Sequence, residues 1–150
     1  MGPDDTVELE ILPVSASIVT LRGKHDLASR PQIAVALAVA RDCGNVLVDL
    51  THTAFIDTTV IDAVLRAAEA LAREGMRLEL VIPQTAQSMR SLFEAVSVTR
   101  LLPVHDTRGA GAASVAPAVA PSVTPGLRIR ALVQKIDSCI DQLEAQRRPA

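Results

Sequence analysis

Residues 45–75, NVLVDLTHTAFIDTTVIDAVLRAAEALAREG, decide the fold because a buried strand and an amphipathic helix follow one another within them. The opening run from Val46 to Leu50 is apolar except for Asp49, which is typical of a strand covered on both faces. Apolar side chains then recur at helical intervals along one stripe, at Ile61, Val64, Leu65, Ala68 and Leu71. Gly75 follows this stripe at the position where a helix commonly ends.

The junction between this strand and this helix, FIDTTV at 55–60, contains the candidate functional residues. Asp57 is a residue type that commonly caps a helix N-terminus, so Thr58 and Thr59 are expected in the first turn. Free backbone N–H groups and the positive end of the helix dipole make such a turn favourable for a phosphate. The sequence therefore predicts a threonine hydroxyl at a position suited to carrying negative charge.

The segments on either side predict the rest of a mixed α/β sheet. Apolar patterns indicate strands over 7–14, 16–21, 46–50, 76–82 and 100–104, and helices after Ser29, Asp57 and Thr85. Ser29 and Gln32 are spaced as in a capping box. The order β-β-α-β-α-β-α-β predicts later strands that are parallel, helices packed on the sheet, and an edge position for the last strand, which contains Pro103. Asp26 and Asp57 would both follow the carboxyl ends of strands, where functional loops are common.

The C-terminal third changes composition. Residues 107–126 hold six Ala, three Pro and three Gly, with Arg108 as their only charge, and they are interpreted as a flexible linker. Residues 127–147 resume a helical period, with an apolar seam at Ile129, Leu132, Ile136, Cys139 and Leu143. Such a short amphipathic helix is marginal alone, so it is expected to dock on its own domain, on a second copy or on another protein.

Composition excludes several classes of function. A formal charge of -2, with two Phe and no Tyr or Trp, argues against nucleic acid as a partner. Cys43 and Cys139 have no zinc-site spacing, and no metal motif, phosphate-binding glycine loop or nucleophile–base pair is present, so we expect no cofactor, no metal and no enzyme activity. No apolar run approaches the length that spans a bilayer, which predicts a soluble, cytoplasmic protein without membrane contact.

The strand at 46–50 followed by Phe55-Ile56-Asp57-Thr58-Thr59 resembles the STAS family, whose members include bacterial anti-sigma factor antagonists. The likeness runs from about Val7 to Asp106, so a STAS domain is expected over 5–106. Residues 21–27, LRGKHDL, look like the family's G-E-x-D-L loop, and 91–94 with 101–104 look like its closing helix and strand.

This resemblance implies a regulatory function. In the family, a D-S-S-G or D-S-T-G loop carries a serine that an anti-sigma factor with kinase activity phosphorylates. The matching position here is Thr58, with Thr59 as the fallback acceptor and Asp57 and Asp26 shaping the loop. The implied activity is partner switching in transcription regulation, in which the unphosphorylated antagonist binds the kinase-type anti-sigma factor, phosphorylation releases it, and a serine/threonine phosphatase resets it.

Three departures from the family pattern leave alternatives open. Lys24 replaces the usual Glu, Val60 replaces the usual Gly and is expected to block close backbone approach, and Asp62 adds negative charge near Thr58. The D-T-x-V pattern is similar to STAS proteins that assemble stress-signalling scaffolds, so the alternative is a scaffold subunit that forms a homo-oligomer, with the C-terminal helix contributing. Asp57 also superficially resembles a response-regulator phosphoaspartate, but the predicted N-terminal strands end without an acidic pair and Lys occurs only at positions 24 and 135.

Overall fold

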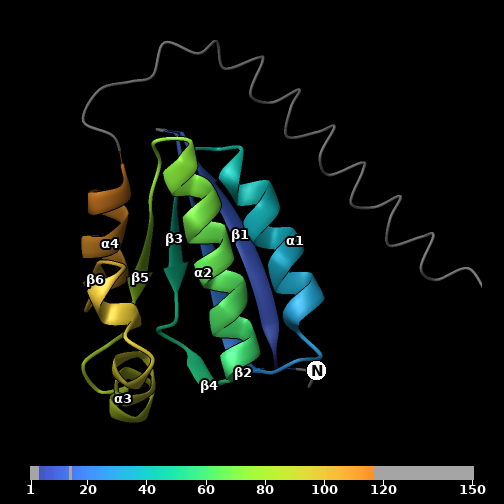
Figure 1. Cartoon of the computed structure of the whole chain (residues 1–150), viewed down its shortest axis with the longest axis vertical. Coiled ribbons are helices and arrows are strands. Elements are labelled where there is room, and N and C mark those ends of the chain that lie inside the picture. Colours follow the sequence, from blue (N-terminus) through green and yellow to red (C-terminus); the bar gives the residue numbers. More distant parts are fainter. Residues whose placement is uncertain (1–3, 14, 117–150) are drawn as a thin grey trace, which may run out of the picture.

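A mixed sheet of six strands forms the centre of the structure, a computed structural model that describes residues 4–13 and 15–116 (Figure 1). The predicted fold class is confirmed. In chain order the elements are β1 Thr6–Leu12, β2 Ala16–His25, α1 Arg30–Arg41, β3 Asn45–Asp49, β4 Thr53–Ile56, α2 Thr58–Arg73, β5 Leu78–Val81, α3 Gln87–Ala95, a 3₁₀ turn Val98–Arg100, β6 Val104–His105 and α4 Arg108–Val115.

The strands lie in the order β1-β2-β3-β5-β6, and β4 pairs with the far end of β2. β1 and β2 are an antiparallel hairpin, while β3, β5 and β6 add in parallel as expected from their helical crossovers. β6 occupies the edge predicted for the strand near Pro103. On the side away from β1, the long β2 therefore pairs with β3 along its first half and with β4 along its second half.

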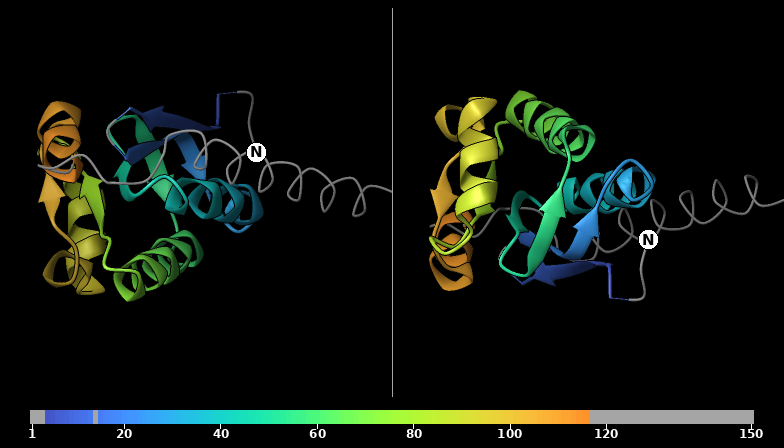
Figure 2. Two further views of the ribbon diagram at one scale, coloured as in Figure 1. Left: turned by 90° about the horizontal axis from the view of Figure 1, so that it is seen from above. Right: turned by 90° about the horizontal axis from the view of Figure 1, so that it is seen from below.

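Helices α1, α2 and α3 cover one face of the sheet, as the view along the strands shows (Figure 2). The main core there is built from aliphatic residues of the strands and the helices, and its largest fully buried side chain is Phe93 of α3. The α2 stripe predicted from Ile61 to Leu71 is buried except for the half-buried Leu65. These helices fix the positions of the loops at their N-terminal ends.

Helix α4 covers the other face and corrects the predicted linker, because residues 108–115 are helical and packed. Val115 is fully buried in a small cluster with Leu47 of β3 and Val81 of β5. Gly111 lies so close to the sheet that a Cβ atom there would come within 2.7 Å of the Leu47 side chain. A small residue at this position lets the helix approach the strands, so the small residues of this segment allow close packing against the sheet.

Polar contacts also hold α4 against the sheet. Arg108 donates to Thr20 at 2.9 Å, to the buried Asp49 at 3.1 Å, and to Glu10. At the other end of the helix, Asn45 Nδ2 donates to the Val115 carbonyl at 2.9 Å. The only charge in the predicted linker is thus an anchoring residue.

Three local predictions are wrong in detail. Ser29 stands before α1 but makes no side-chain capping bond, because its backbone is already helical and its hydroxyl is buried. Ala86, not Thr85, precedes α3. The strand predicted over 100–104 is reduced to two residues after Pro103, and the residues before it form the 3₁₀ turn. The predicted helix at 127–147 and the linker beyond residue 116 lie outside the described residues.

Candidate functional site

The candidate site is the edge of the molecule where β2 and β4 end together. The two strands are parallel, with Lys24 opposite Phe55 and His25 opposite Ile56, so Asp26 and Asp57 follow at adjacent strand ends. The backbone N–H of Asp57 donates to the His25 carbonyl at 3.2 Å. The structure therefore brings together the two loops that were expected to form the site.

Asp57 caps α2 as predicted. One of its carboxylate oxygens, Oδ1, accepts from the backbone N–H of Thr59 at 3.0 Å and of Val60 at 3.2 Å, and from the Thr59 hydroxyl at 2.5 Å. The Thr59 hydroxyl, with the backbone N–H groups of Val60, Thr59 and Leu27, outweighs the effect of burial and holds the pKa of Asp57 below its ordinary value. The carboxylate is thus committed to the helix terminus as an anion.

The two threonines in this turn differ in availability. Thr58 is the first residue of α2 and is exposed, and its hydroxyl has no hydrogen-bond partner in the described part of the chain. Thr59 is half-buried, and its hydroxyl is occupied by Asp57. The geometry makes Thr58 the accessible nucleophile of the pair.

Asp26 lies on the neighbouring loop with its side chain exposed. Its Oδ1 accepts from the backbone N–H of Ala28 at 2.9 Å, and its carbonyl accepts from Ser29 at 3.0 Å. These bonds form a tight turn that leads from β2 into α1. Asp26 therefore shapes the loop beside Asp57, and its exposed carboxylate adds negative charge at this edge.

Comparison with known proteins identifies the family. A family model described as the Mlab, STAS domain matches residues 12–103, well over half of the chain. The chain belongs to the STAS domain family. No curated protein sequence gives a significant match.

Solved structures similar to this STAS domain include three of anti-sigma factor antagonists. The antagonist from Mycobacterium paratuberculosis matches with a TM-score of 0.66 and 20% identity over 76% of this chain and 97% of its own. Unphosphorylated SpoIIAA matches with a TM-score of 0.60 and 18% identity over 76% of this chain and all of its own. The phosphorylated form of SpoIIAA from Bacillus matches with a TM-score of 0.59 and 18% identity over 73% of this chain and 99% of its own. At these identities the likeness shows the fold alone.

The structure changes the meaning of two departures from the STAS pattern. Val60 is completely buried in the main core, so its side chain points inward and leaves the surface of the loop open. Asp62 accepts from Arg30 at 2.8 Å and from Arg66 at 2.9 Å, so its charge is paired and does not add freely to that near Thr58. The expected obstruction by Val60 was therefore wrong.

Two exposed apolar residues next to the loop motifs, Leu27 and Phe55, were not predicted from the sequence. Leu27 is 64% exposed on the Asp26 loop, and Phe55 is 50% exposed at the end of β4. Phe55 also lines a groove of about 170 Å³ between β4 and α3, together with Ala54, Ile56, Ser88, Met89 and Leu92. The sequence does place an apolar residue next to each loop motif. Because the apolar side chains of strands are usually buried, this signal did not predict their exposure.

His25 lies fully buried at the end of β2. Its Nε2 bonds the Arg22 carbonyl at 2.8 Å, while its Nδ1 has no partner within the described residues. Those residues contain no cluster of three acidic, histidine or cysteine side chains placed to hold a metal. Nor does any helix within 4–13 and 15–116 have the length and apolarity to cross a membrane.

The capping role of Asp57 gives a measurable stability effect. Asp57→Ala removes the acceptor of two backbone N–H groups, and we expect it to lower the free energy of unfolding by about 1 kcal/mol. Asp26→Ala removes an exposed acceptor of one backbone N–H, in the turn before α1, and is the control, with an expected loss under about 0.5 kcal/mol. Urea unfolding followed by circular dichroism measures both. Equal losses would contradict the capping assignment.

Proposed function

We propose that this STAS domain is an anti-sigma factor antagonist-like regulatory module that binds a kinase-type anti-sigma factor and is switched by phosphorylation at Thr58. The observation that carries the proposal is the exposed Thr58 hydroxyl, which has no partner among residues 4–13 and 15–116, at the N-terminus of a capped helix. The similar solved structures, which include anti-sigma factor antagonists and the phosphorylated form of one of them, support it. The proposed role is binding and switching, without catalysis by this chain.

The surroundings of Thr58 support an electrostatic switch. A phosphate would bring about two negative charges to a site beside Asp57 and Asp26. The helix N-terminus would stabilise that charge by about 1 kcal/mol, so the folded domain tolerates it. A partner packed over Leu27 and Phe55 would have to strip water from the dianion, which is costly without compensating cations.

Substitutions at Thr58 test the switch. We expect Thr58→Asp to weaken binding to a kinase-type anti-sigma factor by about 30-fold, which corresponds to about 2 kcal/mol, while Thr58→Ala retains binding. Calorimetry with the purified full chain measures both affinities. If the Asp and Ala variants bind equally well, charge at this position is not the switch.

Phosphorylation itself is tested with the same kinase and ATP. We expect Thr58→Ala to abolish incorporation of phosphate and Thr59→Ala to retain it, because the Thr59 hydroxyl is held by Asp57. Mass spectrometry of the modified peptide locates the phosphate. Modification at Thr59 alone would transfer the assignment to the fallback residue. Treatment of the phosphorylated chain with a phosphatase from the same pathway should restore binding.

A further inference from the structure

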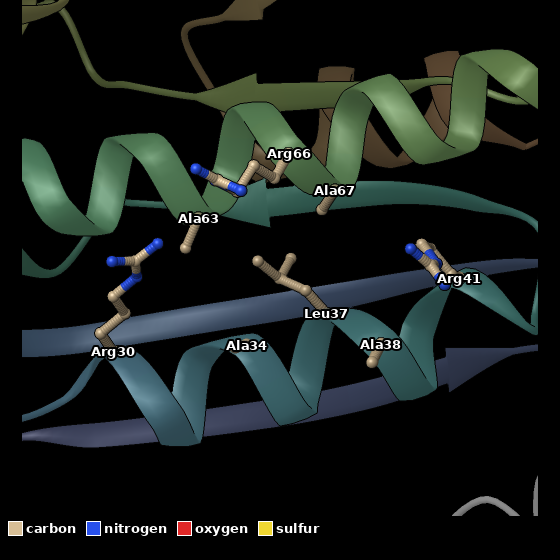
Figure 3. Close-up of a pocket in the computed structure, with 8 residues that line it drawn as sticks. All are labelled: Arg30, Ala34, Leu37, Ala38, Arg41, Ala63, Arg66 and Ala67. Carbon is tan, nitrogen blue, oxygen red and sulfur yellow. The ribbon is translucent and has the colours of Figure 1, made fainter.

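A groove on the outer surface of α1 and α2 has no part in the switch proposed for the Thr58 loop. Its apolar lining consists of Leu37 and four alanines, Ala34, Ala38, Ala63 and Ala67, and it encloses about 180 Å³ (Figure 3). Alanines leave the groove shallow and wide enough for the apolar side chains of another helix. Grooves of this kind commonly receive one face of an amphipathic helix.

The rim of the groove is basic. Arg30, Arg41 and Arg66 are the charged residues that line it, and Figure 3 shows them spread along its length. Asp62 pairs with both Arg30 and Arg66, which leaves an excess of positive charge. A complementary occupant would present an apolar face with carboxylates along its flank.

The chain leaves the described fold at the end of the molecule where α1 and the groove end, on the opposite face of the sheet. The carbonyl of Val115, the last residue of α4, is held by Asn45, and Asn45 comes four residues after Arg41 at the end of α1. Figure 1 shows these ends of α1 and α4 at the same end of the molecule. Residues 117–126 span up to roughly 35 Å when extended, whereas the groove from Arg30 to Arg41 is roughly 17 Å long.

The second half of the sequence after residue 126 has the complementary pattern. The predicted helix carries the apolar seam from Ile129 to Leu143, with the cations Arg128, Arg130 and Lys135 in its first half. In its second half, Asp137, Asp141 and Glu144 recur at offsets of four and seven residues along one flank. We propose that residues 127–147 dock as a helix in the α1–α2 groove of the same chain, with these carboxylates beside the arginine rim. This inference concerns a different surface from Thr58 and does not depend on the proposed function.

Paramagnetic labelling of the full chain tests the docking. A nitroxide is attached to Cys in the variant Ser138→Cys, on the side of the helix away from the seam, with Cys43→Ala and Cys139→Ala removing the native thiols. We expect strong broadening of the methyl signals of Ala34, Ala38, Ala63 and Ala67, and weak broadening for Ala95 at the end of α3. Similar broadening at all five positions, or none, would overturn the proposal.

Charge reversal supplies the matched comparison. Arg41→Glu combined with Arg66→Glu is expected to lower the ratio of docked to undocked chains by about tenfold, which corresponds to about 1.4 kcal/mol. Arg100→Glu changes an exposed arginine outside the groove and should leave the broadening unchanged. An equal effect of both variants would overturn the assignment of the rim.

A mixing experiment separates the own chain from a second copy. Spin-labelled chains without isotopes are mixed with isotope-labelled chains that carry no nitroxide. Intrachain docking predicts no broadening of the groove methyl signals in this mixture. Broadening there would assign the groove to the tail of a second copy and overturn docking within one chain.

Discussion

Gly111→Leu is expected to destabilise the domain by about 3 kcal/mol, because helix α4 cannot accommodate a side chain on the surface that faces the sheet. A Cβ atom at this position would lie 2.7 Å from Leu47 Cδ1 and 2.9 Å from Val81 Cγ2, and both neighbours are fully buried. Neither can move away without disturbing the sheet core, so α4 must shift or detach. Detachment would expose Val115 and the apolar residues beneath it. Chemical unfolding of the full chain measures the loss.

Gly109→Leu is the matched control on the same helix. A Cβ atom there meets nothing within 4 Å, and the residue is exposed. Replacing glycine by leucine in a helix removes a conformational penalty, so the expected change is a gain of about 0.5 kcal/mol. If the two variants lose the same stability, the close approach of α4 to the sheet is not what Gly111 provides.

Helix α4 was predicted as a linker because its sequence carries no local sign of packing against the sheet. Local composition was the only available signal, and a segment rich in Ala and Gly with one charge resembles a flexible connection. The decisive contacts are long-range: Arg108 reaches Thr20, Asp49 and Glu10, and Asn45 reaches the Val115 carbonyl. Tertiary contacts of this kind cannot be seen in a local pattern, whereas the strong strand and helix periodicities of residues 45–75 could be.

The candidate site was predictable to the extent that it depends on local chemistry. Asp57 caps α2 because an aspartate before a helical stripe can accept hydrogen bonds from the free N–H groups of the first turn, and the pattern alone indicates this. The parallel pairing of β4 with β2 was not predicted, since Thr53–Ile56 is too short to stand out as a strand. That pairing is what brings Asp26 beside Asp57. The orientation of Val60 also depends on packing, because a β-branched residue can face either the core or the surface.

Glu79→Gln is expected to destabilise the folded domain by about 2 kcal/mol at neutral pH, because the carboxylate is buried and bonded on several sides. Glu79 is 1% exposed on β5, and it accepts from Ser114 at 2.6 Å, from Arg77 at 2.6 Å, and bonds His105 at 2.7 Å. The amide of glutamine carries no charge and offers one acceptor oxygen in place of two. Because Ser114 belongs to α4, the substitution also weakens the attachment of that helix to the sheet.

The same carboxylate gives stability a defined dependence on pH. Burial alone would raise the pKa of Glu79, but the hydrogen bonds from Ser114 and His105 and the bond and charge of Arg77 outweigh burial and lower it. With a folded-state pKa below the ordinary value of 4.5, the contribution of Glu79 is present at higher pH and is lost as acid protonates the folded carboxyl. The natural protein should therefore lose stability from about pH 5 downward more steeply than Glu79→Gln.

Glu69→Gln is the control for this acid dependence. Glu69 is 66% exposed and pairs with Arg73 one turn away on α2, so its removal is expected to cost under about 0.5 kcal/mol and to leave the acid profile almost unchanged. Urea midpoints for the three proteins between neutral pH and acid measure the slopes. Parallel curves for the natural protein and Glu79→Gln would show that acid acts elsewhere. A flatter curve for Glu79→Gln alone would show that the acid-sensitive part of the stability comes from the buried Glu79 carboxylate, which helps to hold α4 on the sheet.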